Sequence, residues 1–104
     1  MIKSMDVTEL ESKLGNDKNL VLVDVREQAE WDDAHIDGAV FLPLSQLETR
    51  FAELPKDKAL VLQCRSGKRS MNAAQFLADK GYTDLTNLEG GILAWMDEGF
   101  DVVE

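Results

Sequence analysis

The sequence predicts an α/β fold with a mainly parallel central sheet of about five strands and short helices on both faces. Two continuous apolar runs, residues 20–25 and 60–62, are typical of strands buried on both faces of a parallel sheet. Helix-like spacing between the strand candidates favours helices that cover the sheet. The 104 residues contain no repeat or low-complexity tract, so we predict one domain, residues 1–104.

The N-terminal segment predicts a strand followed by a helix. Residues 2–4 are a candidate edge strand. Asp6 followed by Glu9 resembles a capping box, which predicts the start of a helix. This helix should end at Gly15, because glycine adopts the left-handed conformation that follows many helices.

The middle of the chain predicts a helical turn, a strand and a longer helix. Residues 27–31 suggest one helical turn, and residues 39–42 predict a strand that Pro43 stops. Ser45 is a candidate N-cap for the longer helix, which Pro55 should end.

The C-terminal part predicts two strand–helix units. Residues 58–63 predict a buried strand, and helical spacing follows over residues 69–81. Residues 82–87 predict a further short strand. A last helix should follow residues 90–91 and end before Gly99.

The only cysteine, Cys64, follows a predicted buried strand, at the point where a short loop enters a helix. Ligands bind at this edge of open parallel sheets. Loop N–H groups and the helix dipole would form an anion site there, and Gly67 permits a backbone that a Cβ would forbid. Arg65, Lys68 and Arg69 add positive charge, so we expect the pKa of Cys64 to lie below the ~8.5 of free cysteine.

Two other interpretations of Cys64 are weaker. A lone cysteine is commonly an inert buried side chain, but three neighbouring cations favour a reactive thiolate. The other interpretation is a cysteine phosphatase or arsenate reductase. Four residues separate Cys64 from Arg69, one fewer than a phosphatase loop needs to surround a phosphoryl group. The tighter loop fits a single sulfur atom on the cysteine better.

Four segments, in order along the chain, resemble the signatures of the rhodanese family of sulfurtransferases. They are residues 22–27, Trp31 with residues 35–39, the loop from Cys64 to Ser70, and residues 88–95. The resemblance covers nearly the whole chain. It implies a rhodanese-like fold and a thiosulfate sulfurtransferase that needs no cofactor or metal.

The resemblance also implies roles for the loop. Cys64 would be the catalytic nucleophile that takes sulfane sulfur from thiosulfate, or from a persulfide or polysulfide donor, and passes it from a persulfide to cyanide or a thiol. The main-chain N–H groups would hold the persulfide, and the three cations would hold the anionic donor. The substrate-binding residues are then Arg65, Ser66, Gly67, Lys68, Arg69 and Ser70.

Asp24 and Arg26 share one face of the predicted strand and can therefore reach a common network. The resemblance implies that they brace the loop from behind, and the alternative is a surface ion pair of ~0–1 kcal/mol. The resemblance assigns His35 a structural role rather than that of a general base. Trp31 and Trp95 fall at core-facing spacing and are expected in the core.

The composition limits partners and surroundings. The net charge is −9, which disfavours nucleic acid and anionic membranes as partners. Residues 63–70 nevertheless carry three cations and no acid, a spot that attracts small anions. One cysteine excludes an intrachain disulfide, and one histidine argues against zinc. With no signal-like or membrane-spanning segment, we expect a cytoplasmic location.

The sequence leaves one functional alternative open. The same loop serves an enzyme and a non-enzymatic module that relays sulfur between proteins. Two-domain rhodaneses have a companion domain that walls the pocket, and without it we expect an open site that admits protein thiols. The oligomeric state and the physiological donor and acceptor are not readable from the sequence.

Overall fold

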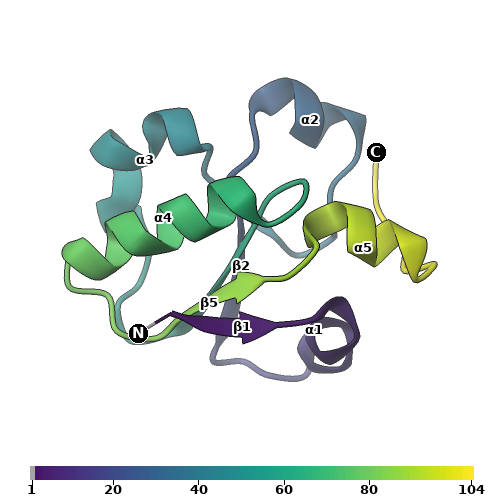
Figure 1. Ribbon diagram of the computed structural model, residues 1–104, viewed down its shortest axis with the longest axis horizontal. Helices are drawn as coiled ribbons and strands as arrows, with labels where there is room; N and C mark the ends of the chain where they lie inside the picture. Colours follow the sequence, from purple (N-terminus) through teal and green to yellow (C-terminus); the bar gives the residue numbers. More distant parts are fainter. Residues whose placement is uncertain (1) are drawn as a thin grey trace.

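The computed structural model describes residues 2–104, and within them it contains one sheet of five parallel strands in the order β1-β5-β4-β2-β3 (Figure 1). The predicted fold class is confirmed. The strands are β1 (Lys3–Met5), β2 (Leu20–Asp24), β3 (Val40–Phe41), β4 (Ala59–Gln63) and β5 (Leu85–Leu88).

Helices cover both faces of this sheet. One apolar core lies under α3 and α4, and the other lies under α1 and α5. Neighbouring strand residues divide between the two cores, as the pleat requires: Leu62 belongs to the first and Val61 to the second. The helices are α1 (Val7–Lys13), α2 (Gln28–Asp33), α3 (Leu44–Arg50), α4 (Lys68–Asp79) and α5 (Gly91–Asp97), with a 3-10 turn at Phe51–Glu53.

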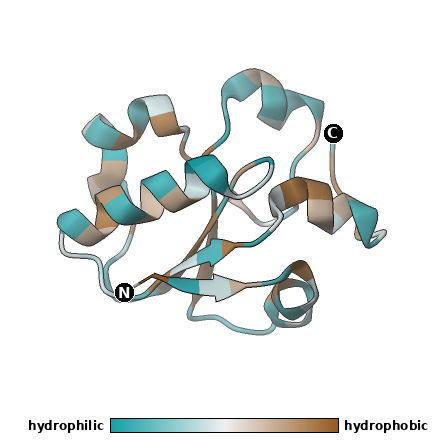
Figure 2. Cartoon of the chain, in the orientation of Figure 1, coloured by the Kyte–Doolittle hydropathy of each residue, from teal (hydrophilic) through white to brown (hydrophobic). Residues whose placement is uncertain are grey.

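Helix α2 differs from the others because none of its residues is buried. Figure 2 shows it as a largely hydrophilic helix. The Trp31 ring packs against Phe41 at 4.9 Å, but α2 contributes no buried residue to either core. Polar contacts with the neighbouring segments hold it instead, and these contacts involve the cysteine loop.

Two predicted helix boundaries are corrected. Helix α3 begins at Leu44, with Pro43 in the N-cap position, so Ser45 does not cap it. The Ser45 hydroxyl instead donates a 2.7 Å hydrogen bond to the Glu27 carboxylate. The helix also ends at Arg50, followed by the 3-10 turn, before Pro55 is reached.

Other boundaries shift by a few residues. The strand predicted at 82–87 spans Leu85–Leu88, because the preceding Tyr82 lies in the core, where its hydroxyl is within hydrogen-bond distance of the Phe51 and Leu54 carbonyls. Of the capping box predicted for Asp6 and Glu9, the N-cap half is confirmed: the Asp6 carboxylate accepts a 2.8 Å hydrogen bond from the Glu9 N–H.

Candidate functional site

The cysteine loop connects the C-terminal end of β4 to the start of α4, as the sequence predicts. Gly67 is the N-cap of α4 with φ +107°, a backbone conformation that residues with a Cβ rarely adopt. The start of α5 lies against the loop (Figure 1). There the N–H groups of Ile92 and Leu93 donate to the carbonyls of Cys64 and Arg65, at 2.9 and 3.1 Å.

The sulfur of Cys64 lies inside this loop. The Gly67 N–H donates to Sγ at 3.1 Å, and the Ser70 hydroxyl oxygen lies 3.4 Å from Sγ. Burial raises the pKa of Cys64, but the contact with the Ser70 hydroxyl and the N–H groups of Ser70, Gly67 and Ser66 bring it below its ordinary value. The pKa of Cys64 is therefore lowered, as the sequence predicts, and the largest lowering causes are hydrogen bonds within the loop.

Cys64 is also covered, with 1% of its surface exposed. It belongs to the apolar core under α3 and α4. On the sequence alone, a buried cysteine and a reactive cysteine are alternatives. In the structure the two are combined, because the same loop covers the sulfur and directs N–H groups at it.

The three loop cations are not equivalent. Arg65 and Lys68 are exposed. Arg69 instead makes two parallel hydrogen bonds, of 2.7 and 2.8 Å, to the carboxylate of Glu30 on α2. These bonds lower the pKa of Glu30 to about 2 and raise the pKa of Arg69. The expectation of three free cations is thus corrected to two, and Glu30 is a residue that sequence reasoning missed.

We predict that Glu30→Gln weakens the folded state at neutral pH and loses part of its acid dependence. The pKa of Glu30 in the folded state lies below the ordinary value of 4.5, so the pair stabilises the fold above pH ~4.5, and this contribution fades as the pH falls towards ~2. The full shift would correspond to ~3 kcal/mol, which screening at this one-third exposed pair reduces to about 1–2 kcal/mol.

Urea unfolding at a series of pH values checks this prediction. Glu53→Gln is the matched control, since Glu53 forms a similar carboxylate–guanidinium pair with Arg50 that is more exposed. Equal losses of stability in the two variants would show that the Glu30–Arg69 pair stabilises the fold no more than the exposed Arg50–Glu53 pair.

Asp24 and Arg26 form a buried pair at the end of β2, not a surface ion pair. The Arg26 guanidinium binds the Asp24 carboxylate at 2.8–3.1 Å, and their side chains are 6% and 0% exposed. Arg26 also donates a 2.7 Å hydrogen bond to the Ala34 carbonyl after α2. Through α2 this pair braces the segment that carries Glu30. A cleft of about 220 Å³ beside the loop is lined by both Arg26 and Arg65.

His35 and Trp31 hold the turn that follows α2. Their rings stack at 3.6 Å with an angle of 5°, and His35 Nδ1 lies 3.0 Å from the Trp31 carbonyl. The backbone of His35 forms an antiparallel bridge with Val103. These contacts support the structural role expected of His35. Trp95 is buried as expected, whereas Trp31 is only partly buried.

Two further residues position the loop and were not singled out from the sequence. Gly91 has φ +58°, and a Cβ there would overlap the carbonyl oxygens of Cys64 and Arg65. Asn87 of β5 donates a 3.0 Å hydrogen bond to the Gly67 carbonyl and accepts one from the Ser70 hydroxyl. Its polar side chain within a buried strand is the signal that could have found it, since buried polar groups need partners.

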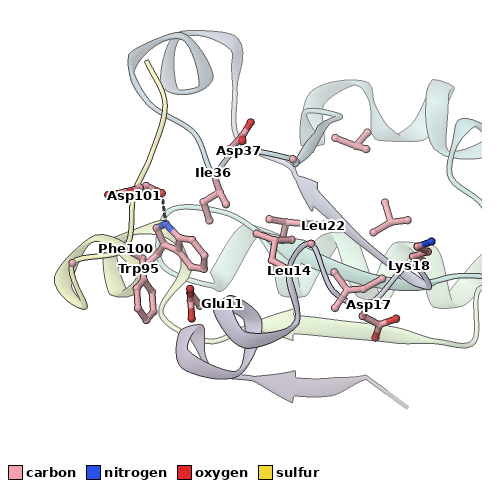
Figure 3. Close-up of a pocket in the computed structure, with 16 residues that line it drawn as sticks. Glu11, Leu14, Asp17, Lys18, Leu22, Ile36, Asp37, Trp95, Phe100 and Asp101 are labelled. Carbon is pink, nitrogen blue, oxygen red and sulfur yellow. Dashed lines mark hydrogen bonds between the residues drawn. The ribbon is translucent and has the colours of Figure 1, made fainter.

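A larger cleft, of about 790 Å³, lies on the face of the sheet covered by α1 and α5 (Figure 3). Leu14, Leu22 and Trp95 contribute apolar side chains to it, and Glu11 contributes a carboxylate at its side. The Trp95 indole N–H donates a 2.8 Å hydrogen bond to the carbonyl of Asp101. No residue of the cysteine loop lines this cleft. The cleft is therefore separate from the surroundings of Cys64.

Residues 2–104 lack two features. No group of three or more histidine, cysteine, aspartate or glutamate side chains is placed to hold a metal ion. No helix in this range has the length and apolar character needed to cross a bilayer.

Comparison with known proteins gives concordant matches. Residues 6–98 match the family described as rhodanese-like domain. The sequence is 38% identical over 103 residues to a protein named sulfurtransferase from Allochromatium vinosum, covering 99% of this chain and 96% of that one. It is 37% identical to thiosulfate sulfurtransferase GlpE of Shewanella oneidensis, across 75% of this chain and 77% of the relative. A rhodanese-related protein from Thermoplasma volcanium superposes with a TM-score of 0.88 at 32% identity, covering 97% of both chains.

Proposed function

The chain belongs to the rhodanese-like domain family, whose relatives include named sulfurtransferases, and from that premise we propose that it transfers sulfane sulfur through a persulfide on Cys64. The observation that carries the proposal is the 3.1 Å hydrogen bond from the Gly67 N–H to Sγ, within a loop that lowers the pKa of the thiol. This arrangement supplies an ionised nucleophile without a separate base.

In the first step the Cys64 thiolate attacks the outer sulfur of thiosulfate. A new S–S bond forms, the bond between the two thiosulfate sulfurs breaks, and sulfite leaves with its electron pair. Since Cys64 is 1% exposed, we expect its side chain to rotate towards the loop mouth as the donor enters. The resulting persulfide would occupy the ring of N–H groups from Ser66, Gly67 and Ser70.

In the second step a thiolate or cyanide attacks the terminal sulfur of the persulfide. The Cys64 thiolate is released, and the acceptor leaves as a persulfide or as thiocyanate. The enzyme alternates between a form with a free Cys64 thiolate and a form with a Cys64 persulfide, so we expect ping-pong kinetics. The name of the Shewanella relative supports thiosulfate as the donor.

The donor's sulfonate would bind to Arg65 and Lys68, because these are the exposed cations of the loop. Arg69 contributes less directly, since both of its terminal guanidinium nitrogens already donate to the Glu30 carboxylate. Gly67 and Ser66 shape the loop. Asp24 and Arg26 support it from the end of β2.

We expect replacement of both exposed cations, Arg65→Ala with Lys68→Ala, to raise KM for thiosulfate about tenfold with a smaller change in kcat. Each exposed contact with an anion contributes about 0.5–1 kcal/mol. The control is Lys13→Ala with Lys18→Ala, which removes the same charge from the part of the chain around α1. An equal rise in KM in the control would attribute the effect to net charge alone.

Mass spectrometry of the protein after thiosulfate treatment tests the proposal itself. We expect a gain of one sulfur, ~32 Da, with release of one equivalent of sulfite, and loss of that mass on addition of cyanide or a thiol. An unchanged mass would overturn the persulfide step with this donor. Sulfur uptake only from a persulfidated protein, with no turnover of thiosulfate, would identify a relay instead of an enzyme.

A further inference from the structure

The Ser70 hydroxyl has one hydrogen and two acceptors within reach. On one side lies Asn87 Oδ1, to which the hydroxyl donates a short hydrogen bond. On the other side lies Cys64 Sγ at 3.4 Å. A serine hydroxyl donates a single hydrogen, so it cannot serve both acceptors at once.

The orientation of Asn87 decides where this hydrogen goes. Its Nδ2 donates to the Gly67 carbonyl at 3.0 Å. Rotating the amide by half a turn would place Oδ1 against that carbonyl, two acceptors facing each other. The Gly67 carbonyl therefore fixes Oδ1 toward Ser70. All three side chains are buried, with Ser70 at 0%, Cys64 at 1% and Asn87 at 6% exposed, so water is a poor substitute partner.

We propose that Asn87 is a positioning residue that sets the reactivity of Cys64 by competing with its sulfur for the hydroxyl hydrogen of Ser70. While Asn87 accepts that hydrogen, the Cys64 S–H can donate to the Ser70 oxygen. Two hydrogen bonds then run in series, from Cys64 to Ser70 and from Ser70 to Asn87. When Cys64 ionises, its sulfur becomes an acceptor. The Ser70 hydrogen can then turn to the sulfur only by leaving Asn87 Oδ1 without a partner.

The two contacts of Asn87 thus act in opposite directions on the Cys64 pKa. The contact with Ser70 favours the thiol. The contact with the Gly67 carbonyl orders the loop whose Gly67 N–H favours the thiolate. We infer that the contact with Ser70 dominates. The Ser70 hydrogen can change partner when Cys64 ionises, whereas the hydrogen bond to the Gly67 carbonyl stays in place.

Charged groups around the sulfur come from several elements, and they are the same in the neutral variant proposed below. Their contribution to the Cys64 pKa therefore cancels between wild type and that variant. They are Arg65 and Lys68 on the loop, the Arg69–Glu30 pair of α4 and α2 with Glu27 beside it, and the Asp24–Arg26 pair after β2.

The test is a titration of the Cys64 thiolate by its ultraviolet absorbance, in the full chain, without any sulfur donor. In Asn87→Leu the Ser70 hydrogen is free to donate to the sulfur. We expect the Cys64 pKa to fall by about one unit, the size of one hydrogen bond to a charged group. In Asn87→Asp the carboxylate holds the same hydrogen more strongly, and we expect the pKa to rise.

Repeating both substitutions in a Ser70→Ala background separates competition from loop ordering. Without the hydroxyl, the fall caused by Asn87→Leu should disappear. A fall of the same size in both backgrounds overturns the proposal, as does an unchanged or raised pKa in Asn87→Leu alone. Thr86→Val is the matched control, because Thr86 is buried on the same strand and has Val61 of the opposite core as its partner in the sheet.

Should Asn87→Leu not fold, Asn87→Asp alone remains decisive. The aspartate keeps an acceptor for the Ser70 hydroxyl and loses the donor to the Gly67 carbonyl. If Asn87→Asp raised the Cys64 pKa equally in the wild-type and Ser70→Ala backgrounds, the added charge alone would explain the rise, and the proposal would be overturned. The inference rests on the proposed function for its consequence in turnover: the pH profile of sulfite release should shift with the pKa. The absorbance titration itself involves no sulfur transfer, so its failure is distinguishable from failure of the persulfide mechanism.

Discussion

Cys64→Ser is expected to lose at least about a thousandfold of its sulfur-transfer rate from thiosulfate, because a serine hydroxyl cannot accept sulfane sulfur as a persulfide. The substitution changes one atom inside the loop, where Sγ receives the Gly67 N–H. Serine retains an acceptor for that hydrogen bond. The loss should therefore reflect chemistry rather than unfolding.

The measurement is sulfite release with thiosulfate as donor, together with the protein mass before and after treatment. Wild type should gain ~32 Da and Cys64→Ser should gain nothing. Wild type treated with sulfite in place of thiosulfate is the control for non-specific additions. Retained turnover in Cys64→Ser would end the assignment, since the chain has no second cysteine to take its place.

Gly91→Ala is expected to destabilise the protein by about 3 kcal/mol and to lower sulfur transfer at least about a hundredfold in the molecules that remain folded. The new Cβ would overlap the carbonyl oxygens of Cys64 and Arg65, and both are main-chain atoms that cannot rotate away. Relief requires the cysteine loop and the start of α5 to separate. That movement breaks the hydrogen bonds from Ile92 and Leu93.

Gly99→Ala is the matched control for the backbone strain. Gly99 also has a positive φ, +79°, but a Cβ there would meet nothing within 4 Å. It should cost about 1 kcal/mol, with activity unchanged. Urea unfolding and sulfite release of the two variants check the prediction. Equal losses in both would mean that the contact of α5 with the loop has no particular importance.

The fold class was predictable because its signals are local. The buried runs that became β2 and β4 contain hardly any polar residue, and a parallel strand covered on both faces requires that pattern. The boundaries were less accurate where a tertiary contact competes with a local preference. Ser45 is a good N-cap residue, yet its hydroxyl donates to Glu27, eighteen positions earlier.

The position of the candidate site was also predictable. Cys64 follows β4, Gly67 has the left-handed backbone that its place in the loop suggested, and the pKa of the thiol is lowered. The state of the cations was not predictable. The sequence around Arg69 does not indicate that Glu30 is its partner, because Glu30 lies thirty-nine positions away. The two side chains meet only because the fold brings α2 to the loop.

The sequence by itself determined that this chain forms a parallel sheet and places a lone thiol at a strand end before a helix. Periodicity and residue type along a short stretch suffice for that. Only the tertiary structure decided which groups hold the loop around the thiol: the Asn87 amide from β5, the α5 N–H groups and the Glu30 carboxylate on Arg69. The physical reason is that hydrogen bonds and steric contacts act over a few ångströms in space, and distance along the chain does not encode that proximity.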